Sequence, residues 1–310
     1  MYRKVSIKTL GVVFVVLLVL VALVEFMDIR NGNRNFKKIL IEVNADDINE
    51  IDLQPKAANG NIIKLVREND VWQMESDGKK YNADQSVAGN LINELNELKP
   101  QSVVATGKDR WKQYEVTDSL GTRVKLLNGS NVVADVIIGK FSYSQPNNMT
   151  SYLRLTGENN VYGVNGMLGM SFNRNLNSFR DKDIIKSAPG DWTKLTFTYP
   201  ADSSFVLEKT YGKWQINSQP ADSASVASYL SSIMRLSDSK FDDSEPGIAS
   251  THQLVISGNA EFKPIKVTGY DVDVDHFYLE SDQNPGTRFN SPESAKKLFV
   301  SAKKFIKKAV

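Results

Sequence analysis

The feature that most constrains this chain is one apolar stretch near its start, Leu10–Val24 (LGVVFVVLLVLVALV). The stretch carries no charged side chain, and its neighbours extend it to the roughly 20 residues that a membrane-spanning helix needs. Lipid offers the backbone no hydrogen bonds, so such a segment is stable there as a helix. We therefore predict a transmembrane anchor at residues 9–27.

Positive charge before the apolar stretch predicts its orientation. Arg3, Lys4 and Lys8 precede it with no acid among them, a bias that keeps residues 1–8 in the cytoplasm and sends the rest of the chain across the membrane. A cleaved signal peptide is the alternative, with its nearest small-residue site at 22–24. Both interpretations place the residues after about 28 outside the cytoplasm.

Composition narrows the class of the remaining chain. The sequence contains no cysteine, which excludes disulfides, thiolate metal sites and thiol nucleophiles. Of 38 basic and 36 acidic residues, three bases and one acid precede residue 28, so 35 of each sign remain. A neutral extracytoplasmic region of this kind does not suggest nucleic-acid binding.

The order of predicted elements begins with a polar linker at residues 28–37 and a strand at Ile39–Val43. Apolar segments on both sides of Asn69-Asp70 predict a β-hairpin. Asp84 is then a suitable N-cap for a helix whose apolar residues recur at helical spacing. Alternating strands separated by turn residues follow, which predicts an antiparallel meander up to residue 188.

The second half of the chain repeats this order after Pro189-Gly190. A hairpin around Tyr211-Gly212 precedes a second capped helix that begins after Asp222, and further strands follow it. We therefore predict an α+β protein: one N-terminal transmembrane helix followed by two tandem repeats of hairpin, helix and antiparallel meander. The predicted domains are residues 38–188 and 189–310, since a repeat of this length indicates tandem domains rather than a solenoid.

A basic amphipathic helix is predicted to end the second domain. Ser291 is a good N-cap and Pro292 suits the first helical position. Six lysines flank its apolar face and form a possible interaction site for anionic lipid or a partner: Lys296, Lys297, Lys303, Lys304, Lys307 and Lys308. The alternative is that lysine stems simply cover the edges of a helix that closes the domain.

Several short segments resemble the DUF4340 family of bacterial membrane-anchored proteins. They are a Trp-Gln-Met hairpin before a capped helix, Tyr114-Glu115-Val116, Ile138-Gly139-Lys140, Tyr152-Leu153-Arg154 with Val161-Tyr162, and Phe179-Arg180-Asp181-Lys182-Asp183. The resemblance covers residues 60–190 well and 190–310 weakly. This sequence departs from it at Glu115, where the family usually has glycine.

The resemblance implies a location and a kind of partner but no reaction. It implies a single-pass protein of the bacterial inner membrane, with a cytoplasmic N-terminus and a periplasmic bulk. Members of the family look like partners of ABC-type transport systems of the gliding-motility kind, so the expected partners are a permease and an ATPase. No catalytic residue is implied, and we predict no enzyme activity and no cofactor.

One acidic segment is a weak candidate for a metal site. Asp271, Asp273 and Asp275 occupy positions 1, 3 and 5 of the twelve-residue calcium pattern, and Asp282 occupies position 12. His276 stands where that pattern requires glycine, so a solvated strand face is the plainer interpretation. The chain's two histidines, His252 and His276, predict no metal site by themselves.

These observations support two hypotheses for function. The first is an accessory or scaffolding subunit of an ABC-type transport or motility-related envelope complex, without enzymatic activity. The alternative is an extracytoplasmic module that binds a glycan or cell-wall polymer in a cleft between the two domains.

Overall fold

Tight turns with left-handed backbone set the local structure of both halves. Asn69 and Asp70 have φ of 50° and 63°, and Tyr211 and Gly212 have φ of 49° and 79°. Two consecutive residues with positive φ match the twist of antiparallel strands. Each pair therefore closes a hairpin, β2–β3 in the first half and β12–β13 in the second.

The computed structural model describes residues 13–14, 16–19, 21, 37–58, 61–145 and 148–307. Within them, the first domain is an antiparallel sheet with strand order β4-β3-β2-β1-β6-β7-β8-β9-β5. Its strands are β1 (Glu50–Gln54), β2 (Ile63–Glu68), β3 (Val71–Ser76), β4 (Lys79–Asn82), β5 (Pro100–Ala105), β6 (Thr122–Asn128), β7 (Asn131–Ser144), β8 (Asn148–Leu155) and β9 (Val161–Asn165).

The sheet of the second domain has eight strands, β14-β13-β12-β11-β16-β17-β18-β19, which repeat the order of the first eight positions of the nine-stranded sheet. Its strands are β11 (Trp192–Thr198), β12 (Phe205–Thr210), β13 (Lys213–Ile216), β14 (Gln219–Pro220), β16 (His252–Gly258), β17 (Ile265–Asp271), β18 (Phe277–Ser281) and β19 (Arg288–Asn290). A separate two-stranded sheet joins β10 (Asp183–Lys186) to β15 (Arg235–Ser237). Strand β10 therefore pairs with the second half, earlier in the chain than the predicted boundary at 188/189.

The predicted α+β class is wrong, because the protein is mostly β-sheet. Strands account for 41% of the structure and helices for 22%. The α-helices of the two domains are short: α2 (Gln85–Leu95), α3 (Leu168–Phe172), α4 (Ser223–Ile233) and α5 (Pro292–Leu298). The two domains also contain short 3₁₀ turns: η1 (Ala45–Asp47), η2 (Lys56–Ala58), η3 (Lys108–Arg110), η4 (Leu176–Ser178), η5 (Pro189–Asp191) and η6 (Ala302–Phe305).

The predicted anchor at residues 9–27 and linker at 28–37 fall almost entirely outside the described residues. In this range the structure describes 13–14, 16–19 and 21, which are helical and exposed, and Lys37. A search of the described residues for a helix that is both long and apolar enough to cross a membrane found none. The transmembrane helix in the predicted fold class is therefore not among the helices that the structure describes.

Two further local predictions differ from the structure. Ile39–Val43 forms no strand; instead Leu40 donates its N–H to the Leu98 carbonyl, and Val43 donates to the Asn96 side chain. The predicted single terminal helix is two pieces, α5 and η6, because Phe299 leaves the helical conformation with φ −96° and ψ 89°.

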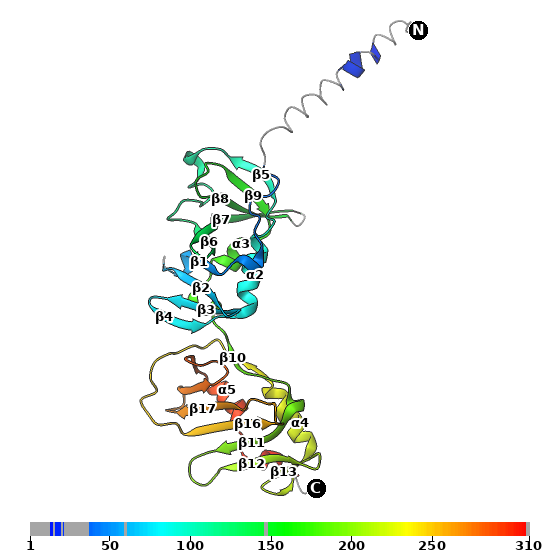
Figure 1. Cartoon of the computed structure of the whole chain (residues 1–310), viewed down its shortest axis with the longest axis vertical. Helices are drawn as coiled ribbons and strands as arrows, with labels where there is room; N and C mark the ends of the chain where they lie inside the picture. Colours follow the sequence, from blue (N-terminus) through cyan, green and yellow to red (C-terminus); the bar gives the residue numbers. More distant parts are fainter. Residues whose placement is uncertain are drawn as a thin grey trace.

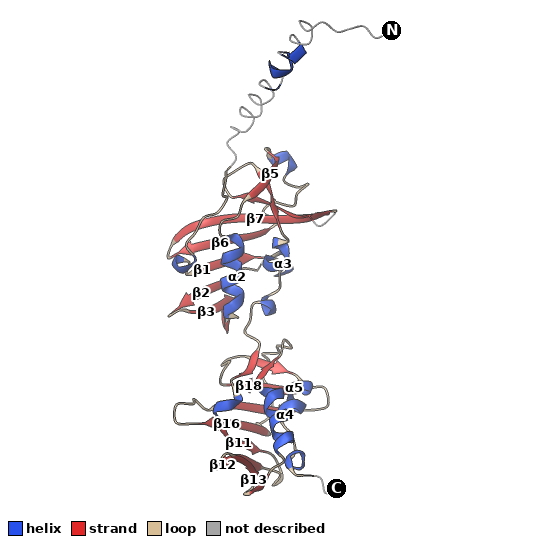
Figure 2. Cartoon of the chain, turned by 90° about the vertical axis from the view of Figure 1, so that its right-hand side faces the viewer, coloured by secondary structure: helices blue, strands red, loops and turns tan. Residues whose placement is uncertain are grey.

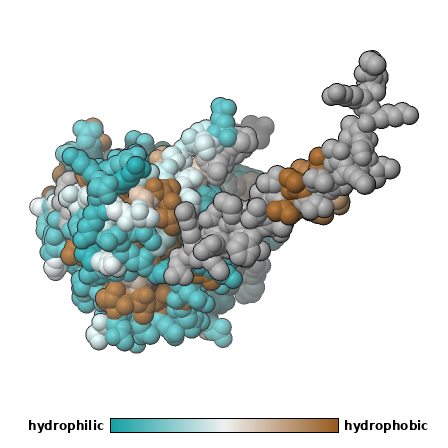
Figure 3. Space-filling view, turned by 90° about the horizontal axis from the view of Figure 1, so that it is seen from above, coloured by the Kyte–Doolittle hydropathy of each residue, from teal (hydrophilic) through white to brown (hydrophobic). Residues whose placement is uncertain are grey.

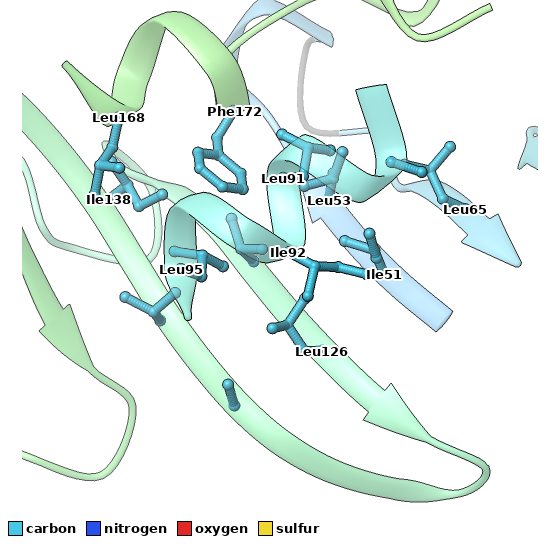
Figure 4. Packing of buried hydrophobic residues seen from close by; sticks show 14 of the residues in the cluster. Ile51, Leu53, Leu65, Leu91, Ile92, Leu95, Leu126, Ile138, Leu168 and Phe172 are labelled. Carbon is cyan, nitrogen blue, oxygen red and sulfur yellow. The ribbon is translucent and has the colours of Figure 1, made fainter. Parts of the chain in front are cut away.

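Each sheet buries one face under a capped helix. Asp84 caps α2 by accepting hydrogen bonds from the backbone N–H groups of Ser86 and Val87, and Asp222 caps α4 in the same manner. Figure 4 shows α2 lying across the first sheet, with Leu91, Ile92 and Leu95 directed at Ile51 and Leu126. These side chains are at most 2% exposed, so burial of apolar area holds the helix on the sheet.

The two domains lie end to end, and each has its own hydrophobic core. Figures 1 and 2 show the first sheet above the second, with one short segment between them. The described main chain begins near β5 and β9 at the upper end, where Lys37 pairs with Glu158. It ends beyond η6 at the opposite end of the molecule. The fold is therefore elongated, with its two chain ends far apart.

The contact of α2 with its sheet gives a direct test of the first core. Leu95→Ala should lower the free energy of unfolding of the first domain by about 2–5 kcal/mol, because it leaves a cavity under a fully buried side chain. Asn93→Ala, on the exposed side of the same helix, should change it by less than about 0.5 kcal/mol. Urea unfolding followed by circular dichroism measures both, and equal effects would contradict the packing described here.

Candidate functional site

The junction between the domains is built around one buried arginine. Arg180 follows the last turn of the first domain, and its side chain is only 2% exposed. An ionised side chain is very costly to bury unless it is paired and hydrogen-bonded. The residues around Arg180 must therefore supply an opposite charge and hydrogen-bond acceptors.

Both domains contribute to the Arg180 pocket. The guanidinium lies between two rings, 4.5 Å from the ring centre of Tyr81 in the first domain and 4.1 Å from that of Phe241 in the second. Its two terminal nitrogens donate to the Asp243 carboxylate at 2.7 and 2.8 Å. Cation–π contacts and a bidentate ion pair thus satisfy the charge from both sides. Among the described residues, the Arg180 Nε has no hydrogen-bond partner.

Backbone hydrogen bonds fix the connecting segment on both sides of Arg180. Toward the first domain, Asp181 donates its N–H to the Asn82 carbonyl. Toward the second, the Asn284 side chain donates to the Asp181 carbonyl at 2.9 Å. Asn82 also reaches across directly, donating to Asn284 Oδ1 at 2.9 Å and to the Pro285 carbonyl at 3.0 Å. The connection is consequently a packed junction and not a free linker.

An open groove of about 480 Å³ lies beside this junction. Second-domain residues line it, including Asp243, Glu245, Lys266, Glu280 and Arg288. Arg288 donates to Glu280 at 2.8 Å, and Arg180 occupies the Asp243 carboxylate. Burial alone would lower the pKa of Arg288, but the hydrogen bond and negative charge of Glu280 have the larger effect. The pKa of Arg288 is therefore raised. Arg288 is therefore paired with Glu280 and Glu245 within the groove, and Asp243 is paired with Arg180 from outside its lining.

A second buried arginine organises the outer face of the first sheet. Arg154 on β8 is 4% exposed, and its guanidinium lies 3.9 Å from the ring centre of Trp111. It donates to the Val116 carbonyl at 2.7 Å and to Asp118 at 3.1 Å. The ring centres of Tyr114 and Tyr152 lie 4.8 Å apart in the same cluster. Segments quoted for the family resemblance, far apart in sequence, thus meet in one cluster.

Glu115 adopts a backbone conformation that favours glycine. Its φ is +58°, in the left-handed region that side chains disfavour. The turn that contains it lies close over Gly139, where an added Cβ would approach the Tyr114 carbonyl oxygen to 2.1 Å. Lys140 donates its N–H to that same carbonyl at 3.1 Å. Close backbone contact therefore requires glycine at 139, and strain is present at 115.

The weak calcium candidate does not come together. Asp271 is the last residue of β17, and Asp273 and Asp275 lie in the turn before β18; all three are exposed, whereas Asp282 follows β18 at the other end of that strand. Asp273 accepts hydrogen bonds from the N–H groups of Asp275 and His276, and these lower its pKa. Within the described residues, no group of three or more His, Cys, Asp or Glu side chains is placed to hold a metal ion.

The two histidines have separate partners. His276 pairs with Asp273, with Nδ1 2.8 Å from Oδ1. His252 Nδ1 lies 2.8 Å from the Thr251 hydroxyl, and its ring packs against Phe277 and Phe299 at 5.3 and 5.2 Å. Burial lowers the pKa of His252, although Asp271 opposes this shift. His252 is therefore a neutral, packed ring at neutral pH.

The lysines of the possible interaction site are split between α5 and the chain end. Lys296, Lys297, Lys303, Lys304 and Lys307 are exposed, and Lys308 lies outside the described residues. Lys304 lies 5.1 Å from the ring centre of Tyr229. Because the helix is broken, the lysines do not share one helical face.

Comparison with known proteins gives a family but no activity. A family model described as "Domain of unknown function (DUF4340)" matches residues 72–252, which is more than half of the 310-residue chain. The chain belongs to the DUF4340 family. No curated protein and no solved structure matches it.

The range of the DUF4340 match is informative because it crosses the junction. It begins at Trp72 in β3 and ends at His252, where β16 starts, so it contains Arg180, Phe241 and Asp243. Sequence analysis quoted Arg180 only as part of a resemblance and did not find its role. The sequence does contain an acidic segment, residues 242–245, that could have been considered as a partner for Arg180. Nothing in the sequence links the two, because Arg180 and Asp243 are 63 residues apart.

The junction can be tested with a matched pair of charge variants. Arg180→Ala should lower the free energy of unfolding by about 3 kcal/mol or more, because it empties a buried pocket and leaves Asp243 unpaired. Lys240→Ala removes the nearby exposed pair with Glu293 and should cost less than about 1 kcal/mol. Chemical unfolding measures both, and small-angle scattering should show a wider spread of domain orientations for Arg180→Ala alone.

The outer-face cluster predicts opposite effects at two neighbouring positions. Glu115→Gly should leave the free energy of unfolding unchanged or raise it by up to about 1 kcal/mol, because it relieves the left-handed backbone. Gly139→Ala should lower it by more than about 2 kcal/mol, because its Cβ would overlap the Tyr114 carbonyl.

Gly89→Ala in α2 is the control for the second of these changes. Its Cβ would meet nothing within 4 Å, so it should be neutral or stabilising by up to about 1 kcal/mol. Thermal unfolding of the three variants measures the differences. A stable Gly139→Ala protein would contradict the close approach of the turn to β7.

Proposed function

We propose that this DUF4340 protein is a non-enzymatic accessory subunit that acts as a scaffold in a membrane transport complex. The apolar stretch Leu10–Val24 tethers it to the bacterial inner membrane, and the two β-sheet domains stand on the extracytoplasmic side. The partners are an ABC-type permease and its ATPase. This choice of partner rests on the family resemblance alone.

The observation that carries the scaffold proposal is the packed junction at Arg180. A scaffold must hold two contact surfaces at a fixed separation, which a flexible linker cannot do. Here the guanidinium is enclosed by rings from both domains and by Asp243, with direct hydrogen bonds from Asn82 to the second domain. Burying a charge at this position costs free energy unless both domains stay in place.

The glycan-binding alternative has less support. Sugar binding commonly uses an exposed aromatic face with polar groups beside it, and the lining of the junction groove contains no aromatic side chain. Trp72, an aromatic candidate at the first hairpin, is 6% exposed and packed in the core. We therefore favour the scaffold over the glycan-binding module.

Purification of the full-length protein from its native membrane in mild detergent tests this function. Stoichiometric recovery of a polytopic permease and an ATPase, identified by mass spectrometry, is the expected result. Arg180→Ala should remain in the membrane fraction but recover at least about tenfold less of both partners, since their contact surfaces are no longer held in register. Lys240→Ala should recover both partners as the unaltered protein does.

Recovery of the protein alone, with its N-terminal stretch intact, would overturn the scaffold proposal. It would favour ligand binding instead, and cell-wall glycans would then be the compounds to titrate. If Arg180→Ala recovered both partners fully, the proposed complex would stand. The proposal that a rigid junction is needed to form it would be rejected.

A further inference from the structure

A basic loop lies at the end of the first domain where the described chain begins. Residues 107–112 (Gly-Lys-Asp-Arg-Trp-Lys), here called the Trp111 loop, contain η3. Lys108, Arg110 and Lys112 are exposed, and Asp109 is the only acid among them. Throughout the described chain, none of these three cations forms an ion pair with an acid. The loop therefore presents a local excess of positive charge to its surroundings.

Contacts of Trp111 hold this loop in place. One contact is the Arg154 guanidinium, 3.9 Å from the ring centre. The indole N–H donates to the Asn159 carbonyl at 3.1 Å, and the Trp111 carbonyl accepts from Val116 N–H at 3.0 Å. The neighbouring cations are thus carried on a fixed base, which lowers the conformational entropy lost when they bind a charged surface.

The Trp111 loop lies close to Lys37, because Trp111 and Lys37 contact the adjacent residues Asn159 and Glu158. Trp111 bonds to Asn159, and Lys37, the first residue of the continuously described chain, pairs with Glu158. Figure 2 shows β5, the strand that directly precedes η3 in the chain, at the outermost end of the first domain. Seen end-on in Figure 3, the described surface at this end is mainly hydrophilic, with small hydrophobic patches. Such a surface suits contact with polar headgroups rather than insertion among acyl chains.

Chain length restricts where this end can lie. Twelve residues, 25–36, separate Val24 from Lys37. Fully extended they span about 40 Å, and as a flexible coil about 20 Å. If the apolar stretch is held by a membrane, as in the proposed function, this end of the molecule is the one nearest the bilayer. The lysines of α5 and η6 lie in the second domain, on the other side of the junction from the Trp111 loop.

We propose that the Trp111 loop binds anionic phospholipid headgroups of the membrane to which the chain is tethered. Basic side chains next to an anionic bilayer attract its headgroups, and the attraction falls off within a Debye length. Lys108, Arg110 and Lys112 provide that charge at the end nearest the bilayer. The inference rests on the proposed function, because it requires the tether. It adds a second contact that orients the first domain on the membrane surface.

Single-cysteine labelling of the full-length chain tests the proposal, since the natural sequence has no cysteine. Gln113→Cys places a fluorophore beside the loop, and Ser301→Cys places one in the second domain; both positions are exposed. The protein is reconstituted in vesicles of phosphatidylcholine, with or without phosphatidylglycerol, that carry a nitroxide on a fraction of headgroups. Quenching at 113 should be at least about twofold stronger with phosphatidylglycerol and should be lost in high salt.

Matched charge variants separate binding from mere proximity. Lys108→Gln/Arg110→Gln/Lys112→Gln should reduce quenching at 113 to the level seen in phosphatidylcholine alone. Lys303→Gln/Lys304→Gln/Lys307→Gln should leave it unchanged, and a label at 301 should not be quenched in either lipid. Thermal unfolding of both triple variants confirms that the domains remain folded.

Alkaline extraction of the same vesicles distinguishes the two levels of failure. Release of the protein at high pH would reject the tether and with it the proposed function. Retention without any effect of phosphatidylglycerol at 113 would overturn the loop proposal and leave the tether intact. Phosphatidylglycerol-dependent quenching at 301 instead of 113 would also overturn it, because the distal lysines would then be the lipid contact.

Discussion

The architecture of this protein depends on how the charge of Arg180 is satisfied away from water. Its guanidinium is almost fully buried, so it needs Asp243 and the rings of Tyr81 and Phe241 at the same time. Those groups belong to different domains. Separating the domains would expose the rings and break the ion pair, so this contact opposes separation of two domains that otherwise have independent cores.

In both domains the corresponding loop encloses an arginine, but the arginine belongs to the same domain in one case and to the preceding domain in the other. In the first domain the loop between β5 and β6 folds over its own sheet and encloses Arg154 with Trp111. In the second, the corresponding loop between β15 and β16 carries Phe241 and Asp243 and encloses Arg180 from the preceding domain. The loop of the first domain therefore packs on its own sheet, whereas the loop of the second domain contacts the first domain.

Sequence reasoning succeeded where structure is local and failed where it depends on distant partners. The Asn69-Asp70 turn and the Asp84 cap are set by neighbouring residues, and the structure contains the hairpin and helix they indicate. Strand β1 was not predicted because its alternation is short and its polar residues, Glu50 and Asp52, pair with Lys64 on the adjacent strand. The Arg180 site could not be derived, since its carboxylate lies 63 residues further along the chain.

The separation between Arg180 and Asp243 also has a consequence for the order in which the two groups are synthesised. All elements of the first domain have been synthesised once the chain has passed α3 and η4. Asp243 is made only after β11 to β14, α4 and β15 of the second domain. Until Asp243 has been made, Arg180 has no carboxylate partner from the second domain. A cut in the chain between β10 and β15 would likewise separate the arginine from that carboxylate, so the two halves would be joined there only by non-covalent contacts.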